Sequence, residues 1–194
     1  MKKHCAYVVV RKFPFEVANR DVLPKAREEE IAGCQSDKVK TEKFYAWKLL
    51  EEVLAEKFGR SISDTYFDKT IGKWKMNELH LSISHSFDVV AIAVSTEPIG
   101  VDVELLNDER FAKLKQEKIL GECEQSGDWP PKDLCILWSQ KEAVFKTLDK
   151  ASFVPREMRV NDGVQSQLLD IDGREFVLSV ASDCHAVSIN NECK

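Results

Sequence analysis

The stretch from Leu79 to Glu104 reads LHLSISHSFDVVAIAVSTEPIGVDVE, and its last six residues alternate between two classes. Ile99, Val101 and Val103 are apolar, whereas Gly100, Asp102 and Glu104 are not. In a β-strand, this period of two sends the apolar side chains to the core and both carboxylates to the opposite face. Two ionised carboxylates on one face repel each other unless a cation lies between them. The pattern therefore indicates either a solvated acidic strand face or one side of a site for a divalent cation.

The rest of this stretch predicts two further strands. Apolar and polar residues alternate from Leu79 to Ser84, and His85 continues the parity of the apolar set. Val89–Val94 is a continuous apolar run, which is typical of a strand buried on both faces. Thr96–Pro98 is predicted as the turn that leads into the acidic strand.

Upstream of this stretch, the sequence predicts one strand and two helices. Ala6–Val10 is a short, mostly β-branched run that suits a strand. Pro24–Gly33 has proline and glycine where a helix commonly begins and ends. A longer helix follows, capped by Ser36 or Asp37, with apolar residues at helical spacing as far as Phe58.

The downstream sequence repeats this order of elements. A helical face appears within residues 109–120, and a second helix is predicted from Asp133 to Leu148. Further strands are predicted at residues 158–160, 167–171, 175–181 and 186–189, and Asp172-Gly173 is a strong hairpin signal. Two β-α-α-β-β orders predict an α+β fold of two similar halves in a pseudo-two-fold arrangement. We place the halves at residues 1–97 and 98–194, with an active site at their seam.

Composition narrows the class of protein. The chain has 194 residues and a net charge of −5, which argues against a general nucleic-acid binder. Its six cysteines have no zinc-site spacing, and the N-terminal apolar run is too short for a signal peptide. Since no run has the length of a membrane span, we expect a soluble cytoplasmic protein with reduced thiols and no membrane partner.

A second acidic segment follows the strand stretch. Glu142 and Lys146 are spaced i,i+4 on the predicted helix, beside Trp138. Alone, they suit a surface ion pair that contributes roughly 0.2 to 0.5 kcal/mol. Together with Asp102 and Glu104, they supply three carboxylates and one ammonium, a set that suits Mg²⁺ and open positions for a phosphate. Without cysteine or histidine, the set disfavours zinc.

Donors for an anion are present nearby in the sequence. His85, flanked by Ser84 and Ser86, suits either a hydrogen-bonded core histidine or a donor to a phosphate. Adjacent strand residues point to opposite faces, which makes a nucleophilic Ser-His pair a poor fit. Lys73 and Lys43, taken alone, suit a solvated turn and a solvated helix face.

The order of these pieces resembles that of a known family. S-H-S, an apolar strand, P-I-G-V-D-V-E and then W-S-x-K-E-x-x-x-K look like the motifs of 4′-phosphopantetheinyl transferases of the larger, single-chain, two-half type. The motif-bearing core, Gly72 to Lys146, covers a little over a third of the chain. The β-α-α-β-β order is similar to the layout of that family's pseudo-two-fold fold.

The resemblance implies roles for particular residues. Asp102, Glu104 and Glu142 match the family's magnesium-binding acids, and Lys146 matches the lysine that contacts the transferring phosphate. Glu142 is then also a candidate for the base that takes a proton from the acceptor serine.

The resemblance also implies a set of residues that bind coenzyme A. His85 and Lys73 match coenzyme-binding positions, and Ser84 lies beside the histidine. The basic residues that grip the nucleotide in the N-terminal half do not align, so the candidates there are Lys25, Arg27, Lys40 and Lys43. Three departures concern this grip and carrier docking: Trp74 replaces a proline, Phe87 replaces a small residue, and residues 148–152 replace a Gly-rich stretch.

The activity implied by the resemblance is transfer of the phosphopantetheinyl arm of coenzyme A to a serine of an acyl or peptidyl carrier protein, with Mg²⁺ as cofactor. The resemblance also implies a monomer. Two alternatives stay open from the residues themselves. One is another Mg²⁺-dependent phosphotransferase or pyrophosphatase, and the other is a non-catalytic module that binds a carrier or coenzyme.

Overall fold

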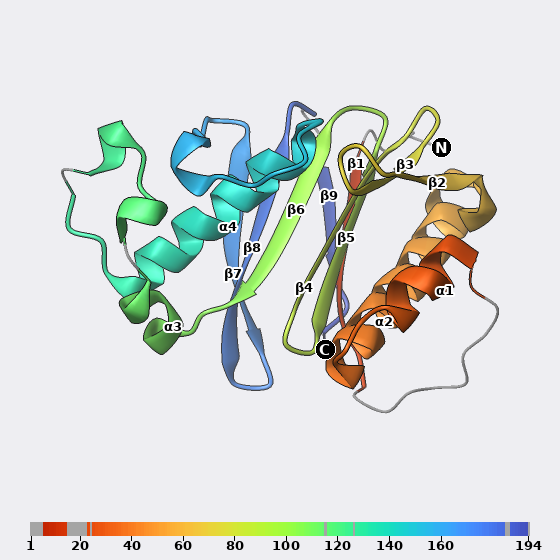
Figure 1. The fold of residues 1–194 in the computed structure, drawn as a ribbon, viewed down its shortest axis with the longest axis horizontal. Helices are drawn as coiled ribbons and strands as arrows, with labels where there is room; N and C mark the ends of the chain where they lie inside the picture. The colour runs from red at the N-terminus through yellow and green to blue at the C-terminus, as the bar shows by residue number, and fades with distance from the viewer. Residues whose placement is uncertain are drawn as a thin grey trace.

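Within the described residues, most of the chain lies in two main β-sheets, a two-stranded β-hairpin and four α-helices (Figure 1). The computed structural model describes residues 6–14, 23, 25–114, 116–125, 127–184 and 187–193. In chain order the elements are β1 (Ala6–Lys12), α1 (Lys25–Ala32), α2 (Asp37–Val53), β2 (Thr65–Asp68), β3 (Lys73–Met76), β4 (His80–Ser86), β5 (Val89–Ser95), β6 (Ile99–Leu105), α3 (Asp108–Lys113), α4 (Pro131–Thr147), β7 (Val164–Ile171), β8 (Arg174–Ser182) and β9 (Val187–Asn191). The mixed α+β class predicted from the sequence is confirmed.

The strands form two main sheets and one hairpin. The first sheet has the order β4-β5-β1-β9, and the second has the order β6-β8-β7. All pairs are antiparallel except β1 with β9, which is parallel. The strands β2 and β3 pair with each other in a separate two-stranded sheet. The short strand β9 thus completes the sheet that contains β1. The division of the chain into halves at residues 1–97 and 98–194 stays a prediction.

Four layers result, in the order helix, sheet, sheet, helix. Helices α1 and α2 cover the outer face of the first sheet, and α3 and α4 lie on the other side of the molecule (Figure 1). The strand β5 is buried on both faces, as the continuous apolar run predicted. Val90, Ile92 and Val94 pack toward α2, whereas Val89, Ala91 and Ala93 pack in the core between the two sheets.

Local signals explain most element boundaries. Helix α2 begins after Ser36 and continues as a short π-helix to Phe58, where Gly59 adopts φ of 62°. In the turn between β7 and β8, Asp172 and Gly173 have φ of 54° and 70°. Positive φ at both central residues is what a two-residue hairpin turn requires, so the Asp-Gly prediction is confirmed.

Two local predictions are wrong, and one pair of strands was missed. Residues 158–160 form no strand. Asp133 lies in the first turn of α4, and Pro130 is at the N-cap position instead. The β2–β3 hairpin was not predicted, because its strands are only four residues long and carry no clear period.

The described cysteines are not all reduced. Cys34, Cys123, Cys135 and Cys193 are free thiols, whereas Cys184 is disulfide-bonded, so the expectation of reduced thiols is wrong at this position. Among the helices of the described ranges, none combines the length and the apolar character needed to cross a membrane.

Candidate metal centre and adjoining pocket

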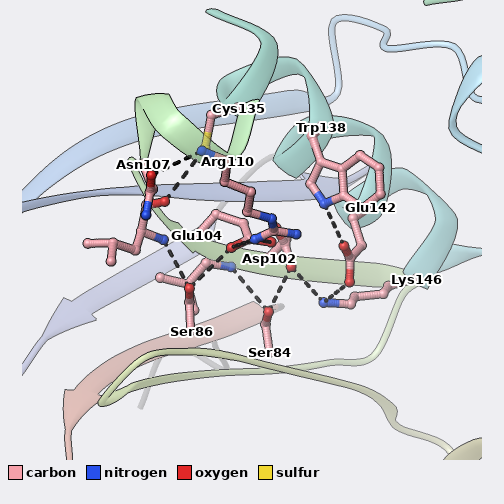
Figure 2. Close-up of polar contacts among 12 residues, drawn as sticks. Ser84, Ser86, Asp102, Glu104, Asn107, Arg110, Cys135, Trp138, Glu142 and Lys146 are labelled. Atoms are coloured by element: carbon pink, nitrogen blue, oxygen red, sulfur yellow. Dashed lines mark hydrogen bonds and ion pairs between the residues drawn. The ribbon is translucent and has the colours of Figure 1, made fainter. Parts of the chain in front are cut away.

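The strand β6 presents its two acids to helix α4. Its apolar residues pack in the core between the sheets, so Asp102 and Glu104 face the other way, as the alternation predicted. Gly100 allows the close approach of α4, because a Cβ atom there would lie 1.9 Å from the carbonyl oxygen of Ala143. The approach brings Glu142 of α4 beside the strand acids (Figure 2).

Three carboxylates gather at this contact. One oxygen from each of Asp102, Glu104 and Glu142 lies within 4.8 Å of the others. Asp102 is 2% exposed, and the side chains of Glu104 and Glu142 are 12% and 26% exposed. Acids this close and this shielded repel one another when all are ionised.

Lys146 supplies a positive charge to the group. Its Nζ atom donates to Asp102 Oδ1 at 2.9 Å and to the Val101 carbonyl at 3.0 Å, and lies 3.4 Å from Glu142 Oε1. Burial alone would lower the pKa of Lys146, but the charges of Asp102 and Glu142 outweigh it and raise that pKa. The lysine is therefore a permanent ammonium at the edge of the acid group.

Arg110 and Trp138 hold the other two acids. Arg110 donates to both carboxylate oxygens of Glu104, at 3.2 and 3.0 Å, and the indole of Trp138 donates to Glu142 at 3.1 Å. Burial and the charges of the neighbouring acids raise the pKa of Glu104 to about 7, despite Arg110. Burial also raises the pKa of Glu142, against the effect of Lys146.

This donor set fits a hard divalent cation. Oδ2 of Asp102 is buried and has no hydrogen-bond partner, which is costly for a carboxylate oxygen unless a cation takes that position. The three carboxylates also outnumber the two cations that contact them, Lys146 and Arg110. Oxygen-only donors are what Mg²⁺ prefers, so Asp102, Glu104 and Glu142 are suited to hold it.

The raised pKa of Glu104 predicts how stability depends on pH. The carboxyl ionises near pH 4.5 in the unfolded chain but only near pH 7 in the folded protein. Without a cation, the protein therefore loses stability as pH rises through this window. We expect Glu104→Gln to remove that loss, so that its stability relative to wild type rises by up to about 3 kcal/mol between pH 4.5 and pH 8.

Urea unfolding in the presence of a chelator at a series of pH values measures this difference. Glu97→Gln, which changes an exposed glutamate, is the matched control and should run parallel to wild type. Parallel curves for Glu104→Gln as well would contradict the charge arrangement described above.

A pocket of about 440 Å³ adjoins the acid group. Glu142 and Lys146 form part of its wall, and the coenzyme-binding residues predicted from the sequence form another part: Lys43, Lys73, Ser84 and His85. Of the other basic candidates, Arg27 lines the pocket, whereas Lys25 and Lys40 do not. The structure thus brings together residues from α1, α2, β3, β4 and α4.

Lys73 has a structural contact that the sequence did not predict. Its ammonium donates to the carbonyls of Phe145 and Leu148 at the C-terminal end of α4. Such a contact satisfies orphan carbonyls and favours the negative end of the helix dipole. Burial lowers the pKa of Lys73. The lysine joins the β2–β3 hairpin to the helix that carries Glu142.

His85 contacts the buried acid Glu42 of α2. Its Nδ1 atom lies 3.3 Å from a carboxylate oxygen of Glu42 on α2, a residue only 6% exposed. Burial and the charges of Lys146, Lys43 and Arg27 lower the pKa of His85 to about 4. The imidazole is therefore neutral at neutral pH.

Several contacts at the site were missed from the sequence. Glu30 accepts hydrogen bonds from Arg27, Lys43 and Trp74, and so organises the basic wall of the pocket. Glu42 and Arg110 were missed as well. The partners of Glu42 and Arg110 at the site lie on other elements or beyond a loop, so the spacing of residues within one helix or strand does not indicate these contacts. The only signal for Arg110 is Asn107, three residues before it, which caps α3 by accepting from the Arg110 amide.

A scan of the chain against protein-family models finds no match, and a search of curated proteins finds none either.

Proposed function

We propose that this protein transfers the 4′-phosphopantetheine arm of coenzyme A to a serine of an acyl or peptidyl carrier protein, with Mg²⁺ as cofactor. The proposal rests on one observation: acidic and basic residues that are far apart in the sequence lie close together in the structure. Asp102, Glu104 and Glu142 lie within 4.8 Å of one another, and Lys146 bonds to Asp102. These are the residues that resemble the family's catalytic positions.

The pocket beside the acids supports a polyanionic co-substrate. Four cationic side chains line it, from Arg27, Lys43, Lys73 and Lys146, against the two acids Glu30 and Glu142. Cations in a concave wall attract phosphate groups strongly, because the low-dielectric surroundings focus their field. Coenzyme A carries three phosphates, and its pyrophosphate has to lie near the reacting phosphorus.

The strand order supports the two-half arrangement of the proposed family. In the first sheet the order is β4-β5-β1, and in the second the corresponding strands β7, β8 and β6 have the same order. Both central strands pair antiparallel on each side. The acid group lies where β6 and α4 of the second half meet β4 of the first.

The proposed reaction is a displacement at phosphorus. The carrier serine oxygen forms a bond to the phosphorus of the pantetheine phosphate, the bond from that phosphorus to the bridging oxygen breaks, and adenosine 3′,5′-bisphosphate leaves. Phosphoryl transfer depends mainly on positioning and on neutralisation of charge. Mg²⁺ held by Asp102, Glu104 and Glu142 would supply most of that neutralisation.

The chain's own residues have separate tasks in this proposal. Lys146, a permanent ammonium, stabilises negative charge on the transferring phosphate. Glu142 accepts the proton of the carrier serine, and burial raises its pKa above that of an ordinary glutamate, which makes the carboxylate a stronger base. His85 and Lys73 hold the nucleotide end, with Ser84 and Lys43 on the same wall.

Incubation with Mg²⁺, coenzyme A and an apo carrier protein, followed by mass spectrometry of the carrier, tests the proposal. The expected result is a gain of one phosphopantetheine group and equimolar adenosine 3′,5′-bisphosphate. No gain on either fatty-acid or peptide-synthetase carriers would overturn it. Breakdown of coenzyme A without a carrier would indicate the hydrolase alternative, and binding without turnover would indicate a non-catalytic module.

A further inference from the structure

Two edge strands of different sheets are joined at the acid group by serine side chains. The hydroxyl of Ser82 on β4 accepts a hydrogen bond from the backbone N–H of Val101 on β6, at 2.9 Å. Ser84 and Ser86 repeat the contact with the N–H groups of Val103 and Leu105, at 3.2 and 3.0 Å. Every second residue of each strand takes part, so hydroxyl groups satisfy N–H groups that would otherwise lie at an open sheet edge.

Two of these hydroxyls, those of Ser84 and Ser86, also donate to the acids. A serine hydroxyl has a single proton, and with a backbone N–H at one lone pair, that proton is available to another acceptor. Ser84 donates it to Asp102 Oδ1 at 2.7 Å, and Ser86 donates to Glu104 Oε2 at 3.1 Å (Figure 2). Ser82 has the corresponding relation to Gly100, which has no side chain to receive a proton.

The hydrogen bond from Ser84 helps to determine which oxygen of Asp102 is left available as a ligand. Oδ1 receives two donors, from Ser84 and from Lys146. Oδ2 receives none, although it is buried. Two donors on one oxygen fix the plane of the carboxylate, and the second oxygen is left without a donor beside Glu104 and Glu142, whose carboxylates lie close to that of Asp102. A bound cation would offset the cost of leaving this oxygen unpaired.

We infer that Ser84 is a positioning residue for the divalent cation: its hydroxyl holds Asp102 so that one carboxylate oxygen stays available as a ligand. The inference rests on the metal centre of the proposed function, and it gives Ser84 a role other than donor to coenzyme A. Ser86 acts in the same way on Glu104, where Arg110 shares the task.

The regular spacing provides a matched pair of variants. Ser84→Ala and Ser82→Ala each remove one hydroxyl that accepts a β6 N–H, but only Ser84→Ala removes a contact to a carboxylate. We expect both to lower the melting temperature by similar amounts. Ser84→Ala should weaken Mn²⁺ binding about 10- to 100-fold, as loss of an outer-shell partner commonly does. Ser82→Ala should keep the wild-type affinity.

Mn²⁺ titration followed by electron paramagnetic resonance measures the affinity without any substrate, and circular dichroism measures the melting temperature. Equal Mn²⁺ affinities in the two variants would overturn the inference while leaving the metal centre in place. Absence of binding in the wild type would overturn the metal centre and this inference together. If Ser84→Ala does not fold, Ser84→Cys replaces it, because a thiol fills the space of the hydroxyl but is only a weak donor. An affinity equal to that of Ser82→Ala would again be contrary.

Discussion

Replacing Asp102 with asparagine is expected to lower the rate of the proposed phosphopantetheinyl transfer by about two to three orders of magnitude, comparable to the loss of one preorganised electrostatic group. The amide oxygen can still accept from Ser84 and Lys146, so the local packing is retained. What is lost is the charge that a divalent cation needs from this position. Transfer to an apo carrier at saturating coenzyme A, over a range of Mg²⁺ concentrations, measures the effect.

The Asp102→Asn prediction has a second expected effect, on the pKa of Glu104, and a matched control variant. The charge of Asp102 contributes to the raised pKa of Glu104, after burial, so the variant should bring that pKa closer to its ordinary value. Asp162→Asn, which changes an exposed aspartate, is the matched control and should transfer at the wild-type rate. An Asp102→Asn protein with the wild-type rate and Mg²⁺ dependence would disprove the assignment of this residue as a ligand.

Gly100→Ala is expected to have the largest effect on stability of any change at the site. The added Cβ would lie 1.9 Å from the carbonyl oxygen and 2.9 Å from the carbonyl carbon of Ala143, both backbone atoms of α4. Neither atom moves without the helix, so the helix has to shift away from β6. We expect a loss of at least about 3 kcal/mol in the free energy of unfolding.

The same shift should separate Glu142 from the strand acids, so cation affinity falls together with stability. Urea unfolding and Mn²⁺ titration measure the two effects. Gly33→Ala is the control, because a Cβ there meets its nearest neighbour at an ordinary 3.5 Å. A Gly100→Ala variant that matched Gly33→Ala in both measurements would show that the β6–α4 contact is not as tight as described.

The alternation in residues 99–104 was sufficient to predict the face of the acids. A strand with one apolar face in a core leaves no other direction for Asp102 and Glu104, and the structure confirms this orientation. The i,i+4 spacing of Glu142 and Lys146 likewise predicted that the two side chains share a helix face. Local periodicity was informative here because both elements are long and packed on one side.

The periodicity of the sequence did not predict contacts between side chains on different elements. Arg110 reaches Glu104 because a two-residue loop and a capped turn direct it back, and Lys73 reaches the end of α4 from a hairpin that the sequence did not reveal. The serines of β4 were predicted to share a face, but their partners on β6 were not. Each of these contacts depends on where separate elements pack, and no short-range pattern records that.

The pairing of β1 with β9 has a consequence for the order in which the chain can fold. Ala6 pairs with Val187, so one edge of the first sheet is completed only by a segment that lies far downstream in the sequence. Pairings this distant in sequence slow folding, because a long loop has to close before the contact forms. Until then β1 has an exposed, strongly apolar edge, which is a surface open to misassociation during translation. A nascent chain stalled before β9 should therefore need protection by a chaperone, even though its acid group and pocket are already encoded.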